Sequence, residues 1–184
     1  QLEDLIENKI SNNKLHTLYI SPLKALTVDV HRNLTNPIED QALDIRVETR
    51  TGDTSSYKKN RQKQTPPQML MTTPESFALL LADIKANEFF KSLKYLIIDE
   101  IHSLVNSKRG DLLSLNLSRL NSISPDCKRI GLSATIKDKV SVLSFLSQKT
   151  KVKIINIEEK SKPKIDILES NNRVPWSGHM AGYA

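Results

Sequence analysis

Short and almost continuously apolar runs recur along this chain, separated by longer amphipathic stretches. The runs are rich in isoleucine, valine and leucine, and they occupy residues 15–20, 45–49, 68–73, 95–99, 129–134 and 152–157. Several of them lack the alternation of apolar and polar residues that a half-exposed strand shows, which is typical of strands buried on both faces. We therefore predict that these runs are strands of a sheet whose two faces are both covered.

The stretches between the runs carry apolar residues at helical spacing. In residues 22–34 the apolar positions recur every three or four residues, and residues 111–120 and 138–146 repeat the pattern. Pro74 stands where a proline in the first turn of a helix stands. In the stretch 111–120, the leucines expected to face the core are those at 112, 113, 115, 117 and 120.

Strands that alternate with helices indicate a parallel sheet with right-handed crossovers and helices on both faces. The predicted fold class is therefore α/β, a three-layer domain around a mainly parallel sheet. In such sheets, ligands bind at the carboxyl ends of the strands. After residue 157 the sequence becomes polar ("EEKSKPK"), which predicts a linker.

The composition limits the class of protein and the kinds of partner that fit this domain. The 184 residues suit one globular domain with a short extension, and the single cysteine excludes an internal disulfide. No apolar run approaches the ~18 residues of a membrane span, so no membrane partner is expected. The net charge of +6 favours an anionic partner. The basic stretch "YKKNRQK" at residues 57–63 fits either a solvated helix face or a phosphate contact.

Two adjacent carboxylates, Asp99 and Glu100, end the apolar run "YLII". A carboxylate at the tip of a buried strand is rigidly held and can bind Mg²⁺ through its waters. A neighbouring carboxylate can position and deprotonate an attacking water. The alternative is that both acids are solvated and cap the next helix.

Four short motifs stand at the predicted strand ends. They are "SPLKAL" from Ser21, "TTPES" from Thr72, "DEIH" from Asp99 and "SAT" from Ser133. In this order they resemble motifs Ia, Ib, II and III of superfamily 2 helicases of the DExH branch. The longer segments "YISPLKAL", "TRTGDTS", "TTPESFALLL", "DEIHSLVNSKRG" and "RIGLSATI" are similar to the large helicase-related (Lhr-type) group. The resemblance covers almost the whole chain.

This resemblance implies a RecA-like fold and a role for each motif. Asp99 would act on Mg²⁺ through water, Glu100 would activate the hydrolytic water, and His102 would link the nucleotide site to the nucleic-acid side. The residues that would couple hydrolysis to domain movement are Ser133, Ala134 and Thr135, although a helix cap is an equally open role for Ser133 and Thr135. The residues that would line a track for one nucleic-acid strand are Ser21, Pro22, Lys24, Arg50, Thr51, Gly52, Thr73, Pro74, Glu75 and Arg109.

The phosphate loop of this family, Gly-x-x-x-x-Gly-Lys-Ser/Thr, does not occur in these 184 residues. Only the helix-like "QLEDLIENKI" precedes the first predicted strand. Because the first residue is Gln1, we expect a piece of a longer protein, truncated at the N-terminal end of its fold. Residues 1–157 are predicted to be a partial first motor domain. Residues 158–184 are predicted to be a linker and the start of a second RecA-like domain, although "GHM" also resembles a vector remnant.

The resemblance therefore predicts a fragment of an ATP-dependent helicase or translocase, moving 3′ to 5′ on DNA and associated with repair. In the parent protein it implies ATP and Mg²⁺ as cofactors, and DNA and the second RecA-like domain as partners. The single cysteine predicts a reducing, intracellular setting, so a cytoplasmic location is expected, in the nucleoid if bacterial. The fragment itself is expected to be inactive. Two other classes stay open: a non-unwinding P-loop ATPase, and a nucleic-acid-binding module whose acids are structural.

Overall fold

The computed structural model describes residues 13–136, 138–147 and 152–156. By their internal contacts, residues 1–152 form one compact unit and residues 153–184 a second. The predicted domain boundary at residue 157 lies near this division, but residues 157–184 lie outside the described part, so the domain assignment stays a prediction. The helix-like stretch at residues 1–10 also lies outside it.

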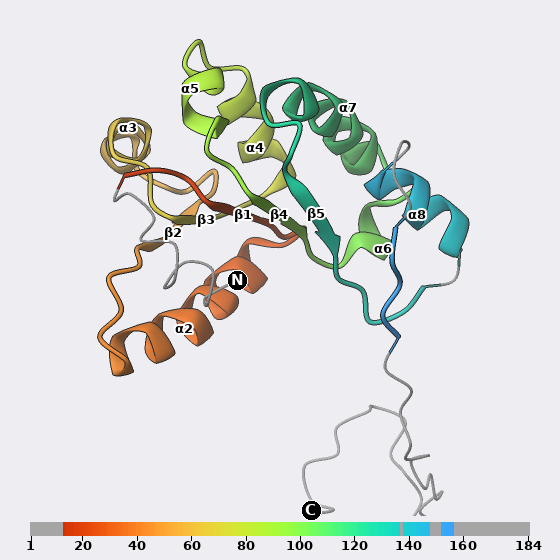
Figure 1. Cartoon of the computed structure of the whole chain (residues 1–184), viewed down its shortest axis with the longest axis horizontal. Coiled ribbons are helices and arrows are strands. Elements are labelled where there is room, and N and C mark those ends of the chain that lie inside the picture. The colour runs from red at the N-terminus through yellow and green to blue at the C-terminus, as the bar shows by residue number, and fades with distance from the viewer. Residues whose placement is uncertain (1–12, 137, 148–151, 157–184) are drawn as a thin grey trace, which may run out of the picture. The chain divides into compact units, whose positions relative to one another are not determined.

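A sheet of five parallel strands forms the centre of the first unit, in the order β2-β3-β1-β4-β5 (Figure 1). The strands are β1 (Thr17–Ile20), β2 (Val47–Arg50), β3 (Met69–Thr72), β4 (Tyr95–Ile98) and β5 (Lys128–Gly131). Ile20 is aligned with Thr72 on one side and Ile98 on the other, and Ile98 is aligned with Gly131. Because every pair in this sheet is parallel, the carboxyl ends of the strands meet at one edge.

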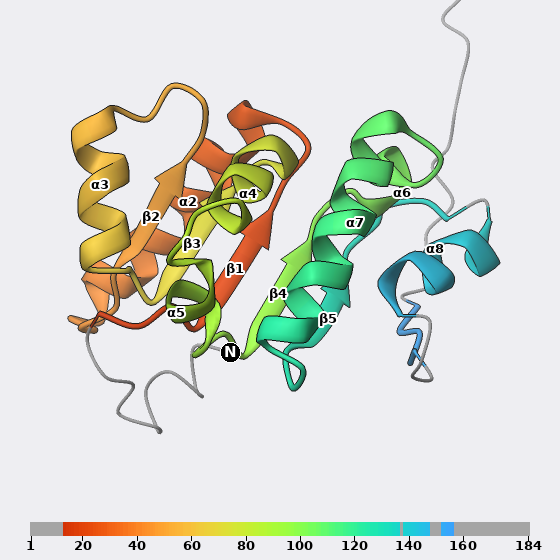
Figure 2. The ribbon, with the colours of Figure 1, turned by 90° about the horizontal axis from the view of Figure 1, so that it is seen from above.

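Helices cover both faces of this sheet, so the predicted three-layer α/β class is confirmed. They are α2 (Lys24–Asp40), α3 (Ser56–Gln64), α4 (Pro74–Leu81), α5 (Ala86–Phe90), α6 (Ile101–Leu104), α7 (Lys108–Ile123) and α8 (Lys139–Leu146). Helix α2 lies on one face, and α4, α5 and α7 lie on the other (Figures 1 and 2). Over the described ranges, no helix combines the length and hydropathy that a membrane crossing requires.

Each face of the sheet has its own apolar core, because successive strand residues point to opposite sides. Leu18 and Ile20 of β1 belong to the larger cluster, together with Phe77 of α4 and Leu113 of α7. Tyr19, between them, belongs to a smaller cluster on the face that α2 covers. The other members of the smaller cluster are Met69, Met71 and Ile97, with Val30, Leu34, Val47 and Ile130 packed against them.

The leucine stripe of α7 is only partly buried. Leu113, Leu117 and Leu120 are almost inaccessible to solvent, whereas Leu112 is 37% exposed and Leu115 is 72% exposed. The prediction that all five face the core is therefore wrong for two of them. Positions 113, 117 and 120 follow the helical repeat of about 3.6 residues and form the inner face, and the other two positions fall outside that face.

Residues 152–156 form no strand, so the prediction of a strand over 152–157 is wrong for these residues. The side chain of Ile155 is 80% exposed. An apolar run becomes a strand only when a neighbouring strand satisfies its backbone groups. None of the pairings among the described strands involves these residues.

Candidate functional site

Polar side chains gather at the edge where the parallel strands end. Asp99 directly follows β4, Ser21 directly follows β1, and Thr73 directly follows β3. Ser133 follows shortly after β5. The structure therefore brings all four sequence motifs to the side of the sheet where parallel α/β proteins bind ligands.

The Asp99 carboxylate is held by one hydrogen bond on each oxygen. Its Oδ1 accepts from the backbone N–H of Glu100 at 2.9 Å, and its Oδ2 accepts from the hydroxyl of Tyr19 at 2.7 Å. Its own backbone N–H donates to the carbonyl of Ile20 at 2.9 Å. Burial and the hydrogen bond to Asp99 both raise the pKa of Tyr19. The sequence analysis missed Tyr19, whose position within an apolar strand gives no sign of a polar role.

Glu100 lies at a sharp turn between β4 and α6. Its φ of 45° places it in the left-handed region, which costs free energy for any residue other than glycine. Its side chain is 36% exposed, and its Oε2 lies 3.3 Å from Nδ1 of His102. The turn therefore holds this carboxylate half in solvent at the strand end, where a water can reach it.

His102 connects the "DEIH" and "SAT" motifs. Its Nδ1 lies 2.8 Å from Oγ of Ser133, and that hydroxyl donates to the carbonyl of Thr135 at 2.7 Å. Because a serine hydroxyl carries one proton, this arrangement requires Nδ1–H of His102 to be the donor to Oγ. Ala134 and Thr135 are exposed beside this contact. The two motifs therefore form one hydrogen-bonded unit.

The residues around Asp99 fit a magnesium ion held mainly by water and phosphate. In residues 13–136, 138–147 and 152–156, no cluster of three or more His, Cys, Asp or Glu side chains could enclose a metal ion. Mg²⁺ usually keeps several waters and is bound through one or two carboxylates plus substrate phosphates. Asp99 retains acceptor capacity on both oxygens beyond the two hydrogen bonds that orient it.

The predicted track begins beyond β1. Ser21 is completely buried, and its hydroxyl has no hydrogen-bond partner among the described residues; Pro22 is also buried. Lys24 is half-exposed and its Nζ donates to both carboxylate oxygens of Asp53, at 2.8 and 2.9 Å. Gly52 is exposed next to this pair. Lys24 and Gly52 are thus accessible to a ligand in this structure, while Ser21 and Pro22 are not.

Arg50 and Thr51 support the loop that follows β2. The Arg50 side chain is buried, and Nη1 donates to the backbone carbonyl of Lys59 at 2.9 Å. Burial lowers the pKa of this guanidinium. The backbone N–H of Thr51 donates to Oγ1 of Thr54 at 2.9 Å. These contacts favour a positioning role, so the predicted contact of Arg50 with nucleic acid stays a prediction.

Helix α4 begins directly where β3 ends. Thr73 caps it by accepting from the N–H of Ser76, and Pro74 stands in its first turn. Glu75 is exposed, and its carboxylate accepts two hydrogen bonds from Arg109 of α7, at 2.6 and 3.1 Å. The bond from Arg109 holds the pKa of Glu75 below its usual range. The structure thus places Arg109 beside the "TTPES" motif.

The basic stretch at residues 57–63 forms α3 and is largely bonded within the protein. Lys59 donates to the carbonyl of Gly52, Arg61 pairs with Glu48, and Lys63 pairs with Asp83. These contacts favour the solvated helix face over the phosphate contact.

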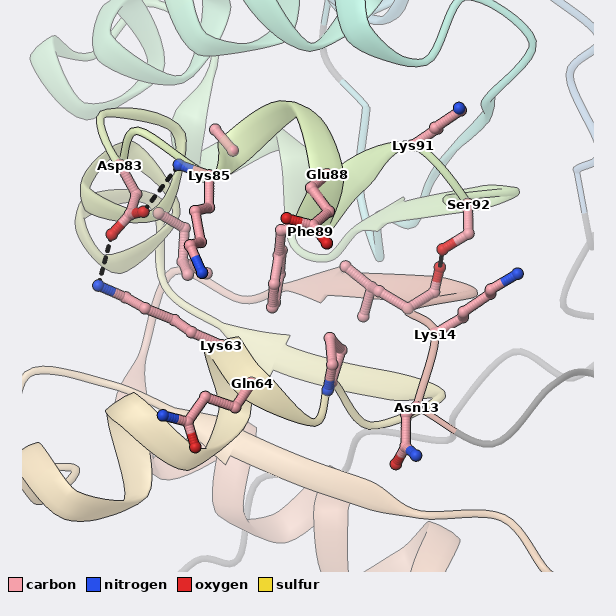
Figure 3. Close-up of a pocket in the computed structure, with 14 residues that line it drawn as sticks. Asn13, Lys14, Lys63, Gln64, Asp83, Lys85, Glu88, Phe89, Lys91 and Ser92 are labelled. Carbon is pink, nitrogen blue, oxygen red and sulfur yellow. Dashed lines mark hydrogen bonds and ion pairs between the residues drawn. The ribbon is translucent and has the colours of Figure 1, made fainter.

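A hollow of about 560 Å³ opens near the end of α3. Figure 3 shows the side chains that line it. Its lining includes Leu15 and Ser92, which precede β1 and β4, so it lies at the amino ends of the strands. Lys63 and Asp83 form an ion pair on its wall. The hollow is therefore remote from the edge that gathers the sequence motifs.

A family model described as DEAD/DEAH box helicase matches residues 2–143. The chain belongs to the DEAD/DEAH box helicase family. The ATP-dependent helicase Lhr-Core of Methanothermobacter thermautotrophicus is 43% identical over 155 residues, which are 79% of this chain and 18% of that protein. The Lhr helicase/uracil glycosylase of Escherichia coli is 39% identical over 82% of this chain and 10% of its own length. The chain thus spans less than a fifth of either relative.

Solved helicase structures share the fold of this chain. The helicase Lhr of Mycobacterium smegmatis bound to ssDNA and AMP-PNP matches with a TM-score of 0.70 and 38% identity, over 79% of this chain and 20% of that one. The DEAD-box helicase Mss116 matches with a TM-score of 0.71 over 80% of this chain and 31% of its own, at 20% identity. The resemblance to Lhr-type helicases and the RecA-like fold are confirmed, whereas the role of each site residue stays a prediction.

Proposed function

We propose that this chain is part of the first motor domain of an ATP-driven DNA helicase or translocase. The observation that carries the proposal is the contact between His102 and Ser133, because it joins two strand-end motifs into one unit at the ligand-binding edge. DNA is supported as the partner by similar helicase structures described as bound to ssDNA and to DNA. Movement from 3′ to 5′, ATP as the fuel and an intracellular location are part of the proposal.

ATP hydrolysis depends on the two carboxylates after β4. Asp99, oriented by a donor on each oxygen, would hold the waters of a bound Mg²⁺, which would supply neutralisation of charge on the transferred phosphate. Glu100, half in solvent at its strained turn, takes the proton of the attacking water. No phosphate loop occurs in the 184 residues, so the remaining phosphate contacts come from another part of the parent protein.

The proposed coupling of ATP hydrolysis to domain movement depends on the contacts that join Glu100, His102 and Ser133. A proton on Nδ1 of His102 faces both the Oε2 of Glu100 at 3.3 Å and the Oγ of Ser133 at 2.8 Å. Displacement of Ser133 therefore changes the surroundings of the catalytic carboxylate. In the proposed motor, Ser133, Ala134 and Thr135 transmit movement of the second RecA-like domain to Glu100 in this way.

The nucleic-acid backbone follows the exposed positions along the same edge. Lys24 and Gly52 are accessible there, and the first turn of α4 begins at the same edge. We expect Lys24→Gln in the full-length protein to weaken binding of single-stranded DNA and to reduce the slope of log K against log salt by about one. Fluorescence anisotropy over a salt series measures both quantities.

The matched control for Lys24→Gln is Lys91→Gln. Lys91 lies beside the hollow at the amino ends of the strands, away from the proposed track. Its replacement is expected to leave the salt slope unchanged. Equal salt slopes for the wild type and Lys24→Gln would show that Lys24 makes no contact with phosphate.

The 184-residue chain alone is expected to show no ATP hydrolysis above background in a single-turnover assay. The lysine and hydroxyl of the phosphate loop, which cradle the phosphates and help hold Mg²⁺, do not occur in its sequence. Hydrolysis by this chain that disappears on Glu100→Gln would contradict the expectation.

Duplex unwinding by the full-length protein tests the proposed function directly. ATP-dependent separation of a duplex with a 3′ overhang is expected, with little separation of a duplex that carries a 5′ overhang. Hydrolysis without strand separation or translocation would indicate the non-unwinding ATPase instead. Nucleotide binding that is absent from the wild type and from Asp99→Asn alike would indicate a binding module without catalysis.

A further inference from the structure

We propose that Tyr19 is a positioning residue for ATP hydrolysis, acting by fixing the carboxylate of Asp99 through its hydroxyl. The inference rests on the proposed function, in which Asp99 holds the waters of Mg²⁺. Tyr19 lies in β1 and is the first residue of the segment "YISPLKAL", but neither the sequence nor the resemblance predicts a role for it. It contacts no nucleotide in this proposal, and its effect on the reaction passes through Asp99 alone.

The sheet register brings the two side chains together. Tyr19 is aligned with Ile97 of β4, and Asp99 follows two residues later. Because side chains two residues apart in an extended chain share a face, Asp99 leaves β4 on the side to which Tyr19 points. The phenol then reaches along the sheet to Oδ2 of Asp99, at 2.7 Å.

The ring of Tyr19 is firmly held, so its hydroxyl has a defined position. The residue is only 6% exposed and packs with Met69, Met71 and Ile97 on the face that α2 covers. A buried aromatic ring of this kind has little freedom to move away from its partner. The apolar cluster thus supplies the rigidity and the hydroxyl supplies the hydrogen bond.

The bond from Tyr19 completes the orientation of Asp99. Across the described residues, Tyr19 is the side chain that donates to this carboxylate, and the other donor is the backbone N–H of Glu100. One donor on each oxygen fixes rotation of the carboxylate about its Cβ–Cγ bond. Loss of the hydroxyl frees that rotation, and residues that orient a metal-binding carboxylate typically change metal affinity or activity by about 10–100-fold when they are altered.

Tyr19→Phe in the full-length protein tests this inference, because it removes the hydroxyl and keeps the ring. We expect the Mg²⁺ concentration for half-maximal binding of fluorescent AMP-PNP to rise about tenfold. The Mg²⁺ dependence of ATP hydrolysis should shift in parallel. DNA binding without nucleotide and the thermal unfolding midpoint should stay close to wild type, which excludes a general loss of structure. Tyr57→Phe, at a tyrosine that is 79% exposed on α3, is the matched control and should change none of these quantities.

A double-mutant comparison separates positioning from packing. If Tyr19 acts through Asp99, then Tyr19→Phe should change the Mg²⁺ dependence of AMP-PNP binding in the wild-type background and have no effect on it in the Asp99→Asn background. Equal shifts in both backgrounds, or Mg²⁺ curves of Tyr19→Phe that superimpose on wild type, would overturn the inference. If the wild-type protein bound AMP-PNP equally well with and without Mg²⁺, and Asp99→Asn bound it as tightly as the wild type, the proposed function would be overturned as well.

Discussion

Glutamine in place of Glu100 in the full-length protein is expected to abolish ATP hydrolysis and to leave nucleotide binding intact. The substitution keeps the size of the side chain and removes its ability to accept a proton from water. General-base catalysis contributes about 10²–10⁴-fold to a rate, so a loss of at least ~100-fold is expected in single-turnover hydrolysis. AMP-PNP binding should change little, because Asp99 and its two hydrogen bonds are untouched.

The control for this prediction is Glu88→Gln. Glu88 lies in α5 beside the hollow at the amino ends of the strands, remote from the proposed site. Glu88→Gln removes the same charge from the protein as Glu100→Gln does. Any general electrostatic effect on the binding of DNA or nucleotide therefore appears in both variants. Turnover that survives Glu100→Gln would show that another group activates the water.

Alanine in place of Gly110 is expected to destabilise the motor domain severely. A Cβ at this position would lie 1.9 Å from the backbone oxygen of Leu104 and 2.8 Å from its carbonyl carbon. Both distances are far below van der Waals contact, and backbone atoms cannot rotate out of the way as a side chain can. Overpacking of this kind costs roughly 3 kcal/mol or more, which a shift of the denaturation midpoint measures.

Gly110 lies close to residues of the proposed site, so its replacement is expected to affect function as well as stability. Its N–H donates to Oγ of Ser107, the residue that caps α7, so the first turn of α7 packs directly on the end of α6. Arg109, adjacent to it, pairs with Glu75. Gly52→Ala is the matched control, because its Cβ would come no closer than 3.6 Å to the flexible end of Lys24. A Gly110→Ala protein as stable as the control would contradict the described packing of α6 against α7.

The strand ends of this domain are readable from sequence because burial on both faces leaves a near-continuous apolar run. The run before Asp99 ends in the structure at Ile98, where the sequence places its charges. Residues 152–156 show the limit of the same pattern, since their apolar character does not reveal whether a neighbouring strand is present. Leu112 and Leu115 show a second limit, because composition does not distinguish the inner face of α7 from the outer one.

The contacts within the site depend on residues that are distant in sequence. Tyr19 and Asp99 are 80 positions apart, and Glu75 and Arg109 are 34 apart. Neither pair produces a local pattern, because the sheet register and the packing of α4 on α7 bring them together. The sequence "TRTGDTS" does not predict the burial of Arg50 either, because arginine side chains are usually exposed. Its hydrogen bond to the carbonyl of Lys59 is seen only in the structure. The motif resemblance correctly predicted that the site lies at the carboxyl ends of the strands. Only the fold revealed which side chains contact one another there.

The central place of β1 in the sheet affects how this domain is synthesised. Thr17 pairs with Met69 on one side and with Tyr95 on the other, so the first described strand waits for partners 52 and 78 residues further along the chain. At roughly 5–20 residues per second, translation leaves β1 without its second neighbour for about 4–16 seconds. During that time a strand that is fully buried in the folded domain lacks at least one of its two neighbours. The nascent chain is therefore expected to depend on chaperones until β4 emerges.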